Sequence, residues 1–226
     1  MEHVVMEFYE KSLAMKHVLI EAVIETLSMS LISTLLATFI GFMLAIVLIV
    51  TDKNGISPNR YTYKILDVLI NMLRSFPFII LIIVLFPVTK FLVGKHTGTF
   101  AMIVPLTIGT APFIARMIEG AFKEVDGSVI EAAKSFGTNK YQIIFRVLLP
   151  EAFPSIVSAI TLSLIIIIGF SAMAGTVGGG GLGAVAMNYG YYRFDGTYIF
   201  WTVFILIVLV QILQSLGDLI YKIVKH

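Results

Sequence analysis

The sequence contains no cysteine, and only 13% of its 226 residues are charged. Without cysteine the chain has no disulfide bond, no thiolate metal site and no cysteine nucleophile. A soluble domain carries about 25% charged residues, so this chain lacks the polar groups to cover its own surface in water. Its net charge of +2 is too small for the basic field that phosphate backbones attract. These absences exclude an ordinary soluble enzyme, a disordered tail and a nucleic-acid-binding module.

The sequence is instead rich in apolar residues, at 58%, with a mean hydropathy of +0.95. A membrane-spanning helix needs about 20 of them in succession. Charge-free intervals lie at 26–51, 97–115, 152–192 and 196–217, with a shorter one at 75–89 that can be extended into 68–73 or 91–93. Because 169–192 contains eight glycines, we interpret 152–192 as one helix, about 154–175, and a re-entrant or extended glycine-rich segment. The sequence therefore predicts an all-α integral membrane protein with five transmembrane helices.

The basic residues are distributed unevenly between the two ends of the predicted spans. Alternate connecting segments contain 5 and 11 Lys and Arg residues, and the positive-inside rule assigns the richer set to the cytoplasm. The N-terminus is then outside, with an external tail at 1–20, and the C-terminus is cytoplasmic, with a tail at 222–226. The start does not have the short apolar core and cleavage site of a signal peptide. An aromatic belt is expected at the outer interface, formed by Tyr189, Tyr191, Tyr192, Phe194, Tyr198 and Trp201.

No ionisable residue lies near the middle of a predicted span. The histidines are all in tails or loops, at His3, His17, His96 and His226. Ion-coupled carriers place an ionisable residue in the bilayer as relay or ligand, and an intramembrane protease needs its base or metal ligand there. An ion-coupled secondary carrier and an intramembrane enzyme are both disfavoured.

Small residues and prolines have two interpretations each. The first span repeats hydroxyl and small residues every four positions, at Thr26, Ser30, Thr34 and Thr38 and at Ala37, Gly41 and Ala45. We favour helix packing there over a pore lining.

Pro77, Pro87, Pro105 and Pro112 predict kinks in the second and third spans. Such kinks either move during function or are simply tolerated in a membrane helix. The glycine run 178–183 lacks the Lys and Ser/Thr of a phosphate loop. We favour backbone that lines an enclosed cavity there over closely packed backbone.

The long connection 116–154 is predicted to be folded. Ser128 and Glu131 have the spacing of a capping box, and Gly137 is a typical residue just after a helix end. Thr138 can cap a second segment that continues to about Leu149, and Pro150 and Pro154 mark the return to the membrane. A helix-turn-helix with two adjacent alanines, Ala132 and Ala133, suggests a docking element. The alternative is an interfacial amphipathic helix that buries Val129, Ile130 and Phe136.

The spacing of this connection resembles a known signature. Glu131-Ala132-Ala133, then Gly137, Val147, Leu149 and Pro150, follow the pattern EAA-x3-G-x9-I-x-L-P of the EAA loop in ATP-binding-cassette (ABC) importer permeases. The single departure is the conservative Val147. Further similarity runs through 74–81, 103–109, 111–117, 171–173, the glycine run and 189–191, and it is greatest with the methionine-uptake permease family.

The resemblance implies a type I ABC importer permease fold at 21–221, with a coupling loop at about 119–153, in a prokaryotic inner membrane. The chain would be a transport subunit without catalytic or metal-binding residues, and it would bind no cofactor because ATP and Mg belong to the ATPase. Its partners would be a second copy of itself, two ABC ATPase subunits, an external substrate-binding lipoprotein and the lipid bilayer, with no nucleic acid.

The implied cargo is methionine, as the D- and L-forms; the alternative cargo is another small amino acid or a related solute. The coupling residues would be Glu131, Ala132, Ala133, Gly137, Val147, Leu149 and Pro150. We place a gate at the end of the fourth helix, where Met173 would act as a flexible plug between Ser171 and Gly175.

Overall fold

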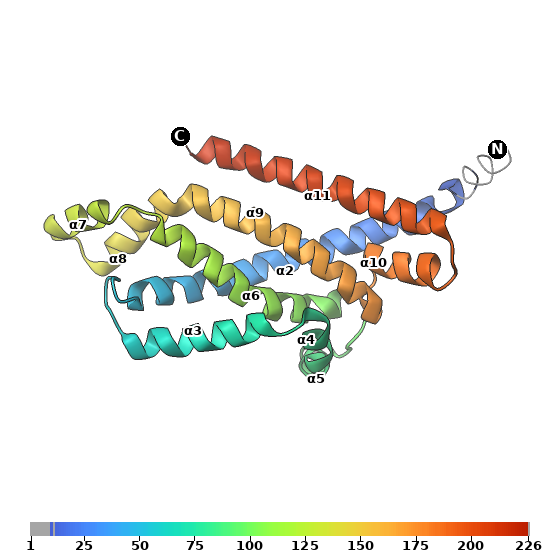
Figure 1. Ribbon diagram of the computed structural model, residues 1–226, viewed down its shortest axis with the longest axis horizontal. Coiled ribbons are helices and arrows are strands. Elements are labelled where there is room, and N and C mark those ends of the chain that lie inside the picture. The colour runs from blue at the N-terminus through green and yellow to red at the C-terminus, as the bar shows by residue number, and fades with distance from the viewer. Residues whose placement is uncertain (1–9, 11, 226) are drawn as a thin grey trace. The chain divides into compact units, whose positions relative to one another are not determined.

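The computed structural model describes residues 10 and 12–225, and every regular element in this part of the chain is a helix (Figure 1). In order these are α2 (Lys16–Thr51), α3 (Arg60–Ser75), α4 (Phe78–Val84), α5 (Phe86–Val93), α6 (Thr99–Lys123), α7 (Gly127–Ser135), α8 (Lys140–Gln142), the π-helical turn η1 (Ile143–Leu148), α9 (Leu149–Ala174), the π-helical turn η2 (Gly175–Gly179), α10 (Gly181–Val185), the π-helical turn η3 (Ala186–Tyr191) and α11 (Gly196–Val224). The predicted all-α class is confirmed. The predicted tails at 1–20 and 222–226 fall in part on 1–9, 11 and 226, which lie outside the described residues.

Four helices in the described part of the chain are long and apolar enough to cross a membrane. They are α2, α6, α11 and the continuous run Lys140–Gly179, and the bent pair α3 and α4 adds a fifth if it forms one broken span. The prediction of five spans agrees with this upper count.

The fourth span begins earlier than the sequence predicted. The helix is continuous from Lys140, whereas the prolines had suggested a start near 154. The Leu149 N–H donates to the carbonyl of Ile144, so the chain enters α9 through a π-helical turn. Pro150, which has no N–H to donate, follows within the first turn of α9, and Pro154 lies farther inside that helix.

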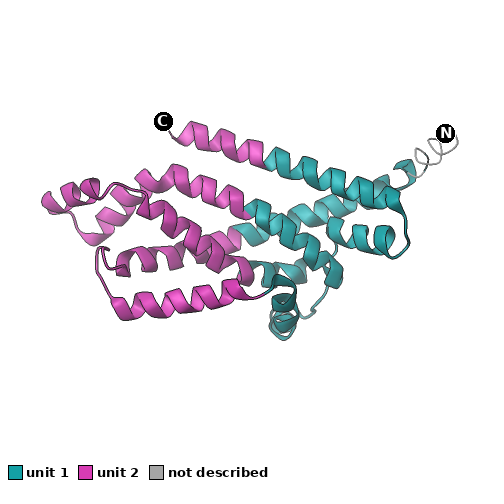
Figure 2. Ribbon diagram, in the orientation of Figure 1, with its two compact units in different colours: residues 1–34, 77–107, 164–213 teal, residues 35–76, 108–163, 214–226 magenta. Residues whose placement is uncertain are grey.

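The chain forms two compact units, each assembled from three separate segments (Figure 2). Unit 1 comprises Met1–Thr34, Pro77–Thr107 and Leu164–Leu213, and unit 2 comprises Leu35–Phe76, Ile108–Ser163 and Gln214–His226. Four of the five boundaries lie inside α2, α6, α9 and α11, so each of these helices contributes one part to each unit, and the fifth lies between α3 and α4.

Unit 1 has a core where α2 meets the short helix α10. Met15, Leu19 and Ala22 are buried there against Leu182 and Val185. Aromatic residues of the predicted outer belt pack around this core, namely Tyr189, Tyr198 and Trp201.

Unit 2 shows what the small residues of the first span do. Its core contains Leu48 of α2, Ile70 of α3 and Ala115 of α6. A Cβ atom at Gly41 would lie 2.9 Å from a methyl carbon of Ile114 and 3.0 Å from backbone atoms of α6. The glycine therefore permits close contact between α2 and α6, which confirms helix packing for this position.

Two of the four prolines expected to kink a span lie at helix breaks. Pro77 separates α3 from α4 in an extended conformation, with φ −59° and ψ 124°. Pro87 lies in the first turn of α5, where a proline costs no hydrogen bond. Pro105 and Pro112 lie inside α6, which continues through both.

Candidate functional site

The predicted docking helix is α7, and it lies exposed at the surface of the chain. None of its residues is buried, and Glu131 and Ala132 are exposed while Ala133 is half-buried. The helix is capped by Asp126, whose side chain accepts a hydrogen bond from the Ser128 N–H at 2.9 Å. The predicted cap at Ser128 is therefore wrong by two residues, because the carboxylate of Asp126 reaches the free N–H groups first.

The end of α7 has the predicted geometry at Gly137. Its φ of 71° is the left-handed conformation that glycine adopts most easily. The Gly137 N–H donates to the carbonyl of Lys134, and the Thr138 N–H donates to that of Ala133. This pair of bonds is the Schellman motif. It turns the chain within two residues and satisfies the last carbonyls of the helix.

The second helix of the loop starts one residue later than predicted. Asn139 is its cap and forms a reciprocal capping box with Gln142, with both bonds at 2.9 Å. Thr138 has another role, because its hydroxyl donates to the carbonyl of Ala133 at 2.6 Å. The turn between α7 and α8 is thus fixed by side chains on both sides of Gly137.

The last part of the signature anchors the loop to the membrane helix. Val147 lies in η1, and Leu149 and Pro150 open α9. Leu148 is buried, whereas Val147 and Leu149 are half-buried. Two aromatic side chains nearby stand in solvent, since Phe136 and Tyr141 are 88% and 76% exposed. The exposed Phe136 is compatible with both predictions for this loop, docking to a partner and an interfacial amphipathic helix.

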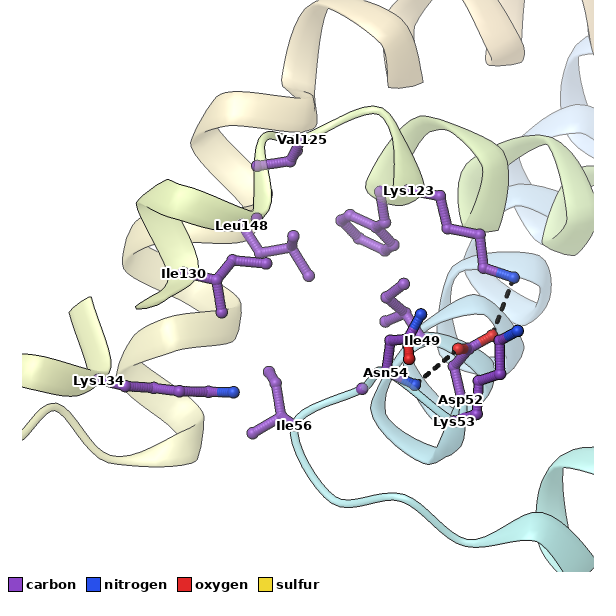
Figure 3. A pocket seen from close by; sticks show the side chains of 13 residues that line it. Ile49, Asp52, Lys53, Asn54, Ile56, Lys123, Val125, Ile130, Lys134 and Leu148 are labelled. Carbon is purple, nitrogen blue, oxygen red and sulfur yellow. Dashed lines mark hydrogen bonds and ion pairs between the residues drawn. The ribbon is translucent and has the colours of Figure 1, made fainter. Parts of the chain in front are cut away.

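A cleft of about 470 Å³ separates this loop from the turn that follows α2 (Figure 3). Ile130 and Lys134 of α7 line it from one side, with Leu148 behind them, and Ile56 lines it from the other. The Lys134 side chain extends into the cleft. The predicted coupling loop, the 52–56 turn and the ends of α2 and α6 thus line this cleft.

A charge cluster with a buried centre joins three elements of unit 2 and is formed by Asp52, Tyr63, Asp67, Arg116, Glu119 and Lys123. Its centre is Glu119, which is 2% exposed. The Glu119 carboxylate accepts hydrogen bonds from Lys123 at 2.7 Å, Arg116 at 2.6 Å and the Tyr63 hydroxyl at 3.0 Å.

The outer members of the cluster reach the neighbouring elements. Arg116 also pairs with Asp67 of α3, and Lys123 pairs with Asp52 at 3.0 Å, directly after α2. Burial opposes ionisation of Asp52, yet hydrogen bonds from the Asn54 N–H and from Lys123 outweigh it and lower the pKa of that carboxyl below its ordinary value. The cluster therefore ties the ends of α2, α3 and α6 next to the coupling loop.

Sequence reasoning did not predict this cluster. The i, i+3 and i, i+4 spacings of Arg116, Glu119 and Lys123 within one helix are visible in the sequence and are typical of ion pairs. The partners on α3 are not visible, because they lie 49 and 56 residues away along the chain.

The three predicted gate residues lie where α9 ends, with Ser171 and Met173 in its last turn and Gly175 at the start of η2. Met173 is 46% exposed, whereas Ser171 is buried and its hydroxyl donates to the carbonyl of Ile168 at 2.7 Å. A Cβ atom at Gly175 would lie 2.5 Å from the backbone nitrogen of Ala184. The glycine thus allows the backbone of α10 to pack directly on the start of η2.

The glycine run, expected to be re-entrant or extended, is closely packed and combines non-helical residues at Gly178 and Gly180 with the short helix α10. A Cβ atom at Gly183 would lie 2.1 Å from the carbonyl oxygen of Ala172, and one at Gly179 would lie 2.7 Å from the carbonyl oxygen of Ala174. These contacts are between main chains, so the glycines permit backbone packing. This is the alternative that the sequence interpretation had ranked second.

Two residues of α2 hold the start of α10. The Glu25 carboxylate accepts hydrogen bonds from the Gly181 N–H at 2.6 Å and from the Thr99 hydroxyl at 3.1 Å. The Thr26 hydroxyl accepts one from the Leu182 N–H at 2.9 Å. A carboxylate and a hydroxyl therefore satisfy the free N–H groups at this helix start. Glu25 borders the charge-free interval of the first span, and the sequence interpretation had assigned it no role.

No group of three His, Asp or Glu side chains that could hold a metal ion occurs among residues 10 and 12–225.

Comparison with known proteins places these features in context. The family described as "Binding-protein-dependent transport system inner membrane component" matches residues 37–226. The probable D-methionine transport system permease protein MetI of Vibrio cholerae is 47% identical over 92% of this chain and 92% of its own length. The methionine import system permease protein MetP of Bacillus subtilis is 47% identical over 78% of this chain and 80% of its own.

Solved structures give the same picture. A chain of the MetNI methionine ABC transporter, in inward-facing conformations, matches with a TM-score of 0.92 at 41% identity and covers 93% of this chain and 98% of that chain. A chain of an amino acid ABC transporter matches with a TM-score of 0.79 at 18% identity over 94% of this chain and 96% of that one, and shares the fold.

Proposed function

The chain belongs to the family of binding-protein-dependent transport system inner membrane components, and from this membership we propose that it is the permease subunit of an ABC importer for methionine. One observation carries the proposal: the similarity to methionine permeases extends over 92% of both chains in the Vibrio cholerae relative and 98% of the MetNI chain. The chain is a transport subunit, and we assign the D- and L-forms of methionine as its cargo.

The permease functions as a homodimer with two ABC ATPase subunits and an external substrate-binding lipoprotein. ATP and Mg are bound by the ATPase, and this chain holds neither. A folded and exposed loop supports this assembly, because α7 buries none of its residues within the chain. Phe136 and Tyr141 offer exposed aromatic surface beside it, and aromatic side chains are frequent anchors of protein interfaces.

The coupling loop lies in the cytoplasm of a prokaryotic cell, with the N-terminus outside the inner membrane and the C-terminus inside. The distribution of basic residues supports this orientation, because five of the sixteen Lys and Arg residues lie in 116–146.

Coupling follows from how rigidly the loop is joined to the helices. The Schellman motif at Gly137 and the capping box of Asn139 fix α7 relative to α8. The half-buried Val147 and Leu149 continue that rigid path into α9. The cluster around Glu119 ties α6, which leads into the loop, to α3 and to the end of α2. Movement of an ATPase that grips α7 would therefore displace the membrane helices together.

The gate stands at Met173, beside Ser171 and Gly175. Its exposed thioether is flexible enough to fill an irregular passage, and the close backbone packing at Gly175 links its position to α10. Glu25 and Thr26 then set where α10 begins.

The proposal is tested by uptake of radiolabelled L-methionine and D-methionine in cells that lack this chain and receive it on a plasmid. We expect uptake to need an active ATPase partner and to persist after the proton gradient is collapsed. Uptake that stops with the proton gradient would indicate an ion-coupled carrier. Strong inhibition by an unrelated small amino acid, with none by methionine, would assign another cargo.

A further inference from the structure

A groove of about 430 Å³, which we call the α2–α11 groove, lies within unit 1 between the beginnings of α2 and α11. Ligand sites in proteins typically have volumes of about 300–1,000 Å³. The lining of the groove is apolar except for three residues with polar groups, namely Ser12, Lys16 and Trp201. None of the proposed coupling or gate residues lines it.

One face of α2 forms the longer wall of the groove. Lys16 is followed at the i+3, i+4, i+7 and i+8 positions of this face by Leu19, Ile20, Val23 and Ile24. Ile20 and Ile24 are exposed at the surface of the chain. An exposed apolar surface with a polar rim is typical of a site that binds a partner or a membrane component.

The cation of this wall is separate from the acidic residues of the same helix. At about 100° per residue, Glu21 lies about 140° and Glu25 about 180° around α2 from Lys16. Glu25 is engaged on that far side, where it accepts a hydrogen bond from the Gly181 N–H. Within the described part of the chain the Lys16 ammonium has no carboxylate partner, so the groove presents one free positive charge.

The polar end of the groove lies at the level expected for lipid headgroups. The Trp201 indole N–H donates to the Ser12 hydroxyl at 2.9 Å. Tryptophan is enriched at this level of a membrane, and a lysine there keeps its ammonium in the polar layer. Both helices then continue into charge-free intervals, 26–51 and 196–217. The apolar end of the groove, at Ile24 and Ile205, therefore lies deeper in the hydrocarbon.

We propose that the α2–α11 groove binds a phospholipid whose headgroup has a net negative charge. The phosphate pairs with Lys16, and one acyl chain lies along Ile20, Ile24 and Phe204. The free lysine favours an anionic lipid over a second copy of the chain, because protein interfaces are depleted of lysine. This inference goes beyond the proposed function and does not depend on which solute the protein transports.

A lipid bound here joins the first membrane helix to the last one. The same part of α2 supports the start of α10 through Glu25 and Thr26, and the core beside the groove contains Leu19 and Leu182. The bound lipid should therefore stabilise the segment that packs on the predicted gate.

The chain contains a single tryptophan, Trp201, which makes occupancy of the groove directly measurable. The full-length chain is reconstituted in mixed vesicles of phosphatidylcholine and phosphatidylglycerol, one of which has brominated acyl chains that quench tryptophan fluorescence on contact. Titrating each brominated lipid against the other gives their relative affinity. We expect phosphatidylglycerol to bind about fivefold more tightly, which is the preference that one lysine confers near an anionic surface.

Variants of Lys16 test the headgroup contact. Lys16→Gln should abolish the preference while both lipids still quench Trp201, and Lys16→Arg should retain it. Lys95→Gln, which removes an exposed lysine outside the groove, is the control and should keep the wild-type preference. Equal quenching of the wild type by the two lipids overturns the anionic headgroup. Quenching by neither lipid overturns the proposal and indicates that a second copy of the chain covers the groove.

Discussion

At the scale of single residues, Glu119 is the charged side chain among the described residues that are buried. It is almost completely buried and accepts hydrogen bonds from a lysine, an arginine and a tyrosine. A buried charge is stable only when its partners compensate for the lost hydration. Glu119 therefore fixes where Arg116 and Lys123 lie, and through them Asp67 and Asp52.

Glu119→Ala should destabilise the protein severely, because two cations and a hydroxyl lose their common acceptor. Breaking a buried pair in this way costs about 3–5 kcal/mol. The measurement is the thermal unfolding midpoint of the purified protein in detergent. Asp67→Ala is the control, since its side chain is 36% exposed and its loss should cost much less. Equal losses in the two variants would show that Glu119 is not the centre of the cluster.

Asp52 should make part of this stability depend on pH. Its pKa is lowered in the folded protein, so its stabilising effect is complete above the ordinary value of 3.8 and disappears as the pH falls through the lower folded value. The difference in unfolding midpoint between wild type and Asp52→Asn should therefore be constant near neutral pH and shrink below about pH 4. A difference that stays constant into that acidic range would contradict the pairing with Lys123.

At the scale of elements, the loop that contains α7 and α8 is a fixed structure whose shape depends on Gly137. The side-chain caps, Asp126 before α7 and Asn139 before α8, satisfy the helix starts, and the left-handed glycine connects the two helices. The loop can transmit force because these local bonds leave it few alternative conformations.

Gly137→Val should uncouple ATP hydrolysis from uptake while the chain still inserts and assembles. A residue with a Cβ atom in the left-handed conformation costs about 1–2 kcal/mol, and valine tolerates it least, so the turn between α7 and α8 should open. The readout is methionine transported per ATP hydrolysed. Gly137→Asn is the matched control and should be milder, because asparagine visits this conformation more readily. Normal coupling in the valine variant would argue against the role of this turn.

Gly183→Ala should disturb the packing of α10 against α9. The added methyl would lie 2.1 Å from the carbonyl oxygen of Ala172, and neither backbone can yield without moving the helix end. We expect reduced uptake and a lower unfolding midpoint. Gly169→Ala is the control, because a Cβ atom there meets nothing within 4 Å, and it should behave like wild type. Similar behaviour of both variants would show that the close approach is unimportant.

The sequence predicted most of these elements because local composition and residue spacing define them. Long charge-free runs identify membrane helices, and the spacing from Glu131 to Pro150 identifies the loop. Cap positions were missed by one or two residues, because Asp126 and Asn139, not Ser128 and Thr138, accept hydrogen bonds from the first N–H groups of α7 and α8. The ion pairs with Asp67 and the clip formed by Glu25 could not be predicted, because they depend on contacts between segments far apart along the chain.

At the scale of the whole molecule, transport needs a barrier that opens only during the cycle, and we assign that barrier to Met173. Its side chain remains 46% exposed in the single chain. A second copy of the chain would supply the opposite wall under the proposed function.

Met173→Ala should make the barrier leaky. Reconstituted vesicles without ATP should then release trapped methionine faster than vesicles with wild type, because a methyl group cannot fill the space of the longer thioether. Met173→Leu, which retains most of the volume, is the matched control and should remain tight. Identical release from all three proteins would remove Met173 from the gate.

Four long helices are each shared between the two compact units. This arrangement limits where the gene can gain or lose codons. One codon inserted between Thr107 and Ile108 would turn the remainder of α6 by about 100° relative to its first part, and every residue beyond would face a different neighbour. Insertions and deletions in related genes should therefore be confined to the connections between helices, such as 53–59 and 94–98. A chimaera that exchanges one unit between two relatives needs five splice points. One lies between Phe76 and Pro77, and the other four lie inside α2, α6, α9 and α11, each joined without a shift in length.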